Sequence, residues 1–219
     1  MTTVYFIRHS VRMKKRDIDI YNTNQANLIK EEKIILSVAG EERAKLLCSK
    51  DELKDIDVVY TSNCVRTLQT AKYLLESQNL KVNIDERLDE RRVGIPNEDK
   101  YPDWFSRQYF DENFKTEGGE SQLDVRNRVS ECFDEIVEKY KGKRIAIFAH
   151  GYAITFFLLR YCKLLDVHDK KLKYEFNGNV IFDKTLNAPD LFKLVLDDNN
   201  NVISIENIVY DDIPFDIGL

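Results

Sequence analysis

The chain contains 219 residues, of which 43% are hydrophobic and 32% are charged, and its formal net charge at pH 7 is −5. This length and balance predict a single globular domain over residues 1–219 rather than a disordered chain. The acidic charge argues against nucleic acid or an anionic membrane as the main partner, because both favour a basic protein face.

No stretch near the first residue combines a basic region with an apolar one, and no apolar run approaches the roughly 20 residues of a membrane span. No membrane partner is therefore expected. The four cysteines are scattered along the chain and include no C-x-x-C pair. A cytoplasmic protein with reduced thiols is the simplest interpretation, and a structural zinc site is not expected.

The first predicted element is a buried strand in the apolar run at residues 4–7, which is followed at once by Arg8, His9 and Ser10. In open α/β sheets, ligands bind just outside the carboxyl ends of the strands. A guanidinium and an imidazole are thus expected where a small anion would bind. The alternative is that His9 only begins a polar loop.

The next stretch, residues 11–33, is polar and charged without a clear period, and it predicts a long loop. It contains a basic cluster at residues 12–16, which is either a solvated turn or a rim that attracts an anionic substrate. Ser37 then fits the N-cap of a helix over residues 40–49.

A strand is predicted at residues 56–60, and a helix capped by Ser62 or Asn63 is predicted at residues 64–76. Arg66 lies about one turn into this helix, near the positive end of its dipole, where a cation is poorly placed for stability. A bound anion would explain Arg66, whereas an exposed arginine on a surface helix is the common alternative.

Strands and helices continue to alternate through most of the chain. The other predicted strands are residues 82–84, 179–182, 191–196 and 202–210, and the other predicted helices are residues 120–140 and 152–161. The last two strands form a hairpin about a turn at residues 197–201. Residues 101–114, within a lid or cap insert at about residues 92–118, are rich in aromatics and form either a lid over a site or part of the core. The whole order predicts an α/β fold with a mainly parallel sheet and helices on both faces.

His150 ends an apolar strand that begins at Arg144, which repeats the design of the first strand. It stands at a strand-to-helix turn, where main-chain N–H groups beginning with Gly151 suit an anion. With Arg8, Arg66 and His9, this histidine would form a metal-free phosphate site in which one imidazole attacks phosphorus and the cations hold the oxygens. A carboxylic acid would then protonate the leaving oxygen.

Six short motifs occur in order between Thr3 and Phe157. They are Arg8-His9, Leu36-Ser37-x-x-Gly40-x-x-x-Ala44, Thr61-Ser62-x-x-x-Arg66-Thr67-x-Gln69-Thr70-Ala71, Arg87-Leu88-x-Glu90, Gly119-Glu120-Ser121 and Phe148-Ala149-His150-Gly151. In these motifs and their spacing the chain resembles the histidine phosphatase superfamily, also called the phosphoglycerate mutase-like family.

The resemblance implies a three-layer α/β/α sandwich and a role for each residue of the site. His9 would be the nucleophile that becomes phosphohistidine. Arg8 and Arg66 would bind the phosphoryl oxygens, and His150 would be the fourth member of the pocket. No metal and no cofactor are implied.

The resemblance also implies that Glu90 is the proton donor, because it follows Leu88 as in the family's Leu-x-Glu. Glu86 and Asp89 are weaker candidates for this role.

The chain departs from the family's pattern after the nucleophile. Ser10 replaces the usual glycine, and its hydroxyl either donates to phosphate or is merely tolerated. Lys15 stands where asparagine is common, and the Trp-Asn of glycolytic mutases is missing. Arg12 gives Arg-His-x-x-Arg, similar to the acid phosphatase branch, in which that arginine contacts phosphate. These differences favour a phosphatase over a mutase.

A basic rim for a substrate with more than one anionic group is a further hypothesis. Its members would be Arg12, Lys14, Lys15, Arg91 and Arg92.

The expected function is that of a metal-independent phosphatase that hydrolyses small phosphomonoesters through a phosphohistidine on His9. The alternatives are a cofactor-dependent phosphoglycerate mutase and a non-catalytic member that binds phosphorylated ligands. A binding module needs neither a nucleophile nor a proton donor, which argues against the last. A monomer or a homodimer is expected, because the hairpin either closes the sheet edge or pairs with another subunit.

Overall fold

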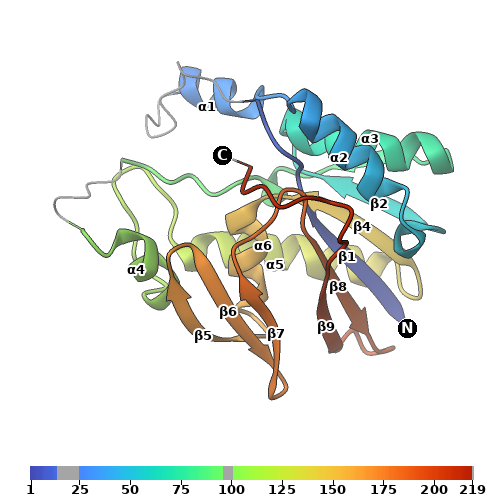
Figure 1. Cartoon of the computed structure of the whole chain (residues 1–219). Helices are drawn as coiled ribbons and strands as arrows, with labels where there is room; N and C mark the ends of the chain where they lie inside the picture. The colour runs from blue at the N-terminus through green and yellow to red at the C-terminus, as the bar shows by residue number, and fades with distance from the viewer. Residues whose placement is uncertain (14–24, 96–100, 219) are drawn as a thin grey trace.

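The computed structural model describes residues 1–13, 25–95 and 101–218. Its centre is a six-stranded sheet in the order β3-β2-β4-β1-β8-β9 (Figure 1). The strands are β1 (Thr2–Arg8), β2 (Val58–Thr61), β3 (Val82–Ile84), β4 (Arg144–Ala149), β8 (Leu191–Leu196) and β9 (Val202–Ile208). The first four are parallel to one another, β8 is antiparallel to β1, and β9 is antiparallel to β8. The expected mainly parallel sheet and its terminal hairpin are confirmed.

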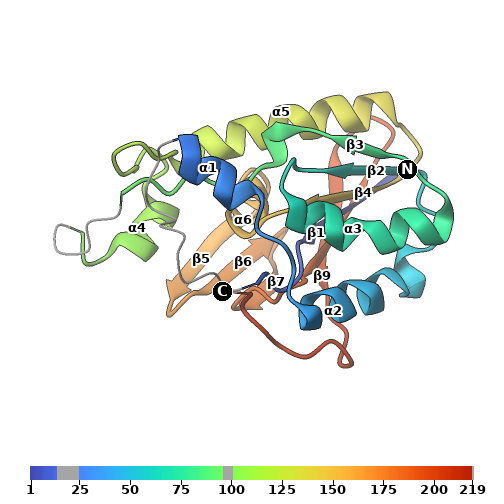
Figure 2. The same ribbon diagram turned by 90° about the horizontal axis from the view of Figure 1, so that it is seen from above.

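Helices cover both faces of this sheet, as Figure 2 shows. The helices of the described residues are α1 (Gln25–Glu32), α2 (Val38–Cys48), α3 (Val65–Gln78), α4 (Trp104–Phe110), α5 (Gln122–Lys139) and α6 (Gly151–Leu158), with the short 3-10 helices η1 (Asp51–Leu53) and η2 (Glu86–Leu88). α5 and α6 pack on one face of the sheet, and α2 and α3 pack on the other. Side chains alternate along β1, which explains the two layers. Val4 and Phe6 face the core under α5 and α6, whereas Tyr5 and Ile7 face the core under α2 and α3. The predicted α/β/α sandwich is therefore confirmed.

A second sheet of three antiparallel strands follows α6. Its strands are β5 (Lys163–His168), β6 (Lys171–Phe176) and β7 (Asn179–Lys184). The prediction includes only β7, because charged side chains interrupt the apolar pattern of the other two. Val167, Leu172 and Tyr174 are buried and join the core that α5 and α6 share.

The local predictions for helix ends are partly right. Ser37 caps α2 and accepts a hydrogen bond from the N–H of Gly40 at 3.0 Å, as predicted. The predicted cap of α3 is wrong, since Cys64 occupies the N-cap and makes no side-chain cap hydrogen bond. Ser62 instead engages His150.

The stretch predicted as one long loop, residues 11–33, contains α1, so that prediction is wrong for its second half. Three members of the basic cluster, Lys14, Lys15 and Arg16, lie outside the described residues.

The aromatic segment at residues 101–114 divides between core and surface. Tyr109 is buried in the core beside α6, whereas Phe110 is 63% exposed. All four cysteines are buried and free. In the part of the chain that the structure describes, no helix has both the length and the apolar character needed to cross a membrane.

Candidate active site

Two neighbouring strands bring His9 and His150 together. β1 and β4 are parallel partners with Arg8 opposite Ala149, so the residues that follow them lie at the same edge of the sheet. The two imidazole rings meet edge to face, with 5.2 Å between their centroids. His9 is 4% exposed, and His150 is fully buried. The two predicted histidines therefore lie side by side in the interior.

A main-chain carbonyl group fixes the tautomer of His9. Nδ1 lies 2.7 Å from the carbonyl oxygen of Ser10. Because a carbonyl oxygen only accepts hydrogen bonds, we assign the proton to Nδ1 and the lone pair to Nε2. Burial lowers the pKa of His9 well below its ordinary value, and the positive charges of Arg66 and Arg8 lower it further. The result is a neutral imidazole with a nucleophilic nitrogen.

Hydroxyl groups at the start of α3 orient His150. Its Nε2 lies 2.8 Å from Ser62 Oγ, which lies 2.8 Å from Thr67 Oγ1. Its Nδ1 is buried and has no hydrogen-bond partner among the described residues. Burial lowers the pKa of His150 well below its ordinary value, and the charge of Arg66 adds to the effect. His150 thus keeps one ring nitrogen for a ligand.

Arg8 uses its terminal nitrogens to bind main-chain oxygens from distant segments. Nη1 donates to Leu186 at 3.2 Å and to Asn187 at 3.0 Å, and Nη2 donates to Ile217 at 2.9 Å. The third nitrogen, Nε, is buried and without a partner in the described part of the chain. Burial lowers the pKa of Arg8, and the negative charge of Glu90 opposes that shift.

Arg66 is arranged in the same way. It is 1% exposed, its Nη1 donates to the main-chain oxygen of Glu31 at 2.8 Å, and its Nη2 lies 3.4 Å from Glu31 Oε1. Its Nε is buried, again with no partner among the residues described. Arg12 Nη1 donates to the same carboxylate oxygen at 3.2 Å. Two of the predicted phosphate-binding arginines therefore share Glu31.

Ser10 is fully buried beside His9. Its main-chain N–H donates to Thr70 Oγ1 at 3.0 Å, while its own Oγ has no partner within the described ranges. Four buried polar atoms of this kind belong to residues around His9. They are Arg8 Nε, Ser10 Oγ, Arg66 Nε and His150 Nδ1. Leaving such a group unpaired costs about 1–3 kcal/mol, and phosphoryl oxygens would accept hydrogen bonds from all four.

Main-chain N–H groups hold the carboxylate of Glu90. Oε1 accepts from Arg91 at 2.9 Å and from Tyr152, in the first turn of α6, at 3.1 Å. A Cβ atom added at Gly151 would lie 3.6 Å from Arg8 Nε and 3.8 Å from Glu90 Oε2. Gly151 thus lies against both the carboxylate and the unpaired guanidinium nitrogen. Of the weaker candidates for the proton donor, Glu86 is exposed.

Asp89, the other weaker candidate, faces the N-terminus of α3. It accepts a hydrogen bond from the N–H of Asn63 at 3.1 Å, and burial raises its pKa to about 6. Ligand atoms of Asp89, Cys64 and His150 lie within 4.8 Å of one another, a grouping typical of metal sites. The positive charge of Arg66 acts on all three and opposes a bound cation. The charge of Arg66 therefore argues against a metal ion at these three residues.

One residue of the predicted basic rim, Arg91, does not lie at the surface. Arg91 is 3% exposed and donates through Nε to the main-chain oxygen of Glu120 at 2.8 Å, so it lies in the interior. Arg92 is exposed, and Lys14 and Lys15 lie outside the described residues.

The sequence does not identify Glu31, because its stretch predicts a loop, and it indicates Ser62 only as a helix cap. Ser62 follows a strand directly and precedes Arg66 by one helical turn. This position is the signal that could have indicated a role in the site. Arg128 was also missed, and it donates to the main-chain oxygens of Arg87 at 2.8 Å and Asp89 at 2.9 Å.

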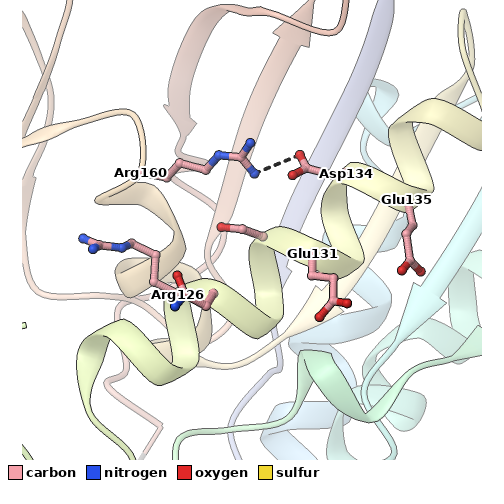
Figure 3. A pocket seen from close by; sticks show the side chains of 7 residues that line it. Arg126, Glu131, Asp134, Glu135 and Arg160 are labelled. Carbon is pink, nitrogen blue, oxygen red and sulfur yellow. Dashed lines mark hydrogen bonds and ion pairs between the residues drawn. The ribbon is translucent and has the colours of Figure 1, made fainter. Parts of the chain in front are cut away.

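A separate hollow lies on α5, where Arg160 pairs with Asp134 at 2.8 Å (Figure 3). The residues that line it are Arg126, Asn127, Ser130, Glu131, Asp134, Glu135 and Arg160. None of them belongs to the site around His9 and His150.

Known proteins resemble the chain in sequence. The profile of the histidine phosphatase superfamily (branch 1) matches residues 4–180. Phosphoserine phosphatase 1 of Hydrogenobacter thermophilus is 32% identical over 141 residues, which are 60% of this chain and 65% of that protein. A probable phosphoglycerate mutase of Yersinia enterocolitica is 26% identical over 162 residues, which are 70% of this chain and 72% of that protein.

Solved structures resemble the chain in fold. The complex of a mycobacterial glucosyl-3-phosphoglycerate phosphatase with inorganic phosphate aligns with a TM-score of 0.63 and 18% sequence identity. The alignment covers 95% of this chain and 96% of that one. At this identity the likeness concerns the fold alone.

Proposed function

The chain belongs to the histidine phosphatase superfamily, and from this premise we propose that it hydrolyses small phosphomonoesters, without a metal ion, through a phosphohistidine on His9. One observation carries the proposal, namely a neutral His9, protonated on Nδ1, beside four buried polar atoms without described partners. Relatives named as phosphatases support it.

The proposed reaction has two steps. Nε2 of His9 attacks phosphorus in line, the bond from phosphorus to the ester oxygen breaks, and Glu90 gives that oxygen a proton. Water then attacks the phosphohistidine, Glu90 takes a proton from the water, and inorganic phosphate leaves as the imidazole is restored.

The other residues of the pocket stabilise the charge of the transferring group. Arg8, Arg66 and Ser10 donate to its oxygens, as does the N–H of Gly151 in the first turn of α6. His150 donates through Nδ1 when its Nε2 accepts from Ser62.

Arg12, which Glu31 holds, adds a further positive charge to the phosphate site. The aromatic segment at residues 101–114, where Phe110 is exposed, limits which esters enter.

The Yersinia relative supports a second candidate, a cofactor-dependent phosphoglycerate mutase. Such an enzyme would return the phosphoryl group to a second oxygen of its substrate rather than to water. The basic residues that replace Trp-Asn after His9 favour the phosphatase. A nucleophile and a proton donor in one pocket argue against a non-catalytic member of the family.

We place the protein in the cytoplasm, as a monomer or a homodimer. Four buried, free cysteines are consistent with a reducing compartment. β9 stands at the edge of the central sheet, where a second copy can pair.

The test is turnover with EDTA present, across p-nitrophenyl phosphate, phosphoserine, sugar phosphates, 3-phosphoglycerate and nucleotides. We expect release of inorganic phosphate that His9→Ala abolishes and that His168→Ala, at the exposed third histidine, leaves intact. Conversion of 3-phosphoglycerate without phosphate release would favour the mutase. Phosphate binding with no turnover of any ester would favour the non-catalytic reading.

A further inference from the structure

Glu31 links two of the arginines that are predicted to bind phosphate. It stands in the last turn of α1, and its main-chain oxygen accepts a hydrogen bond from Arg66 Nη1 at 2.8 Å. Its Oε1 lies 3.2 Å from Arg12 Nη1 and 3.4 Å from Arg66 Nη2. Both guanidinium groups are therefore tied to one residue of one helix.

The location of this acid is unfavourable for the helix itself. Negative charge at the C-terminal end of a helix opposes its dipole, and α1 ends with Glu31 and Glu32. Its first turn, where negative charge would stabilise it, contains no acidic residue. An acid that destabilises its own helix while it contacts two cations indicates a role outside the helix.

The positive charges around His9 also indicate a role for Glu31 outside its helix. Arg66, Arg8 and Arg12 all lie close enough to His9 to lower its pKa. Arg66 is almost completely buried, and a buried arginine without a paired anion is strongly unfavourable. Glu31 supplies the paired anion.

A carboxylate on phosphate-binding arginines has one of two roles. It either orients the arginines or occupies the place of phosphate until a substrate displaces it. Glu31 takes up the two terminal nitrogens of Arg66 and leaves Nε unpaired. Ser10 Oγ, Arg8 Nε and His150 Nδ1 are likewise without a described partner while Glu31 is in place. Glu31 therefore leaves these four atoms open to the oxygens of a phosphoryl group.

We propose that Glu31 is a positioning residue, which holds Arg12 and Arg66 in the orientation in which they bind the phosphoryl group. The inference rests on the proposed function and extends it to a residue outside the six sequence motifs. Glu31 orients these two arginines, as the main-chain oxygens of three residues orient Arg8.

Three variants test this role. Glu31→Ala removes the carboxylate, and Glu31→Gln keeps an acceptor oxygen without the charge. Glu42→Gln, the control, removes the same charge from an exposed position on α2. Calorimetry with inorganic phosphate gives Kd, turnover of p-nitrophenyl phosphate gives kcat and KM, and thermal unfolding checks that each variant is folded.

We expect Glu31→Ala to weaken phosphate binding and to lower kcat/KM by about tenfold or more, because the arginines lose their fixed orientation. Glu31→Gln should lie between it and the wild type, and Glu42→Gln should match the wild type. Tighter phosphate binding or a lower KM in Glu31→Ala would identify a competitor of the substrate and overturn the proposal. Constants within about twofold of the wild type would overturn it as well.

The two proposals fail in different ways. A wild-type protein that binds phosphate but hydrolyses no ester would contradict the proposed function, while the Kd values of the variants would still test Glu31. An active wild type with unaffected Glu31 variants would contradict only the role of Glu31.

Discussion

Glu90 and Glu86 lie four positions apart but in different surroundings. Main-chain N–H groups of Arg91 and Tyr152 hold Glu90 against the pocket, whereas Glu86 is exposed in η2. We expect Glu90→Gln to lower kcat by about 10² to 10⁴ for alkyl phosphates, whose leaving oxygen needs a proton. The loss should be much smaller for p-nitrophenyl phosphate, and Glu86→Gln should change neither rate. Equal losses for both kinds of ester would exclude Glu90 as the acid.

Asp89 makes the stability of the protein depend on pH. Burial raises its pKa from 3.8 to about 6, so the folded state keeps a proton that the unfolded state has lost between these values. Its contribution to the free energy of unfolding is therefore greatest below about pH 4 and falls as the pH rises to about 6. Above that range Asp89 is charged in both states, and the contribution stays constant.

Asp89→Asn removes this titration. The free energy of unfolding of the variant minus that of the wild type should rise by about 2 kcal/mol from about pH 4.5 to about pH 7, at 1.36 kcal/mol per pKa unit. Urea unfolding of both proteins at the two pH values measures the gain. Comparing the two proteins cancels the titration of His9 and His150, whose lowered pKa values act in the opposite direction. A difference that does not vary with pH would contradict the raised pKa.

At the scale of elements, α5 positions the segment that contains Glu90. Arg128 on this helix donates to the main-chain oxygens of Arg87 and Asp89, and its Nε lies 2.9 Å from Glu120 Oε1. We expect Arg128→Met to lower kcat about tenfold for alkyl phosphates but less for p-nitrophenyl phosphate, because Glu90 loses its support. Arg126→Met on the same helix is the control. A uniform loss for both esters would indicate destabilisation alone.

The elements that the sequence predicts well are those whose pattern is local. The apolar runs of β1 and β4 identify buried strands, and the polar residues that follow them identify the edge where His9 and His150 lie. β5 and β6 escape prediction because their burial depends on contact with the distant α5 and α6, which no short pattern encodes.

The same distinction applies to the site. The motifs predict which side chains gather at the sheet edge, and the roles of those side chains remain predictions. The groups that hold Arg8 are main-chain oxygens, which every residue possesses, so no residue type marks them. Glu31 could be recognised only once α1 was seen beside α3.

At the scale of the whole molecule, the last described residues return to the first strand (Figure 1). Ile217 accepts a hydrogen bond from Arg8, and the main-chain oxygen of Asp216 accepts from the N–H of Ala188 at 2.8 Å. Removal of residues 215–219 should lower kcat/KM about tenfold, because Arg8 loses a charge-assisted hydrogen bond. Phe215→Ala, which removes only an exposed side chain, should retain full activity. If the truncated protein is folded and fully active, this contact does not contribute to catalysis.

The carbonyl groups around Arg8 also determine when the pocket forms. They lie 178 to 209 positions along the chain from the arginine, so the pocket combines some of the longest loop closures in the molecule. Contacts of such high order form late in folding. During refolding, activity should therefore appear only after strands β1 to β4 have assembled.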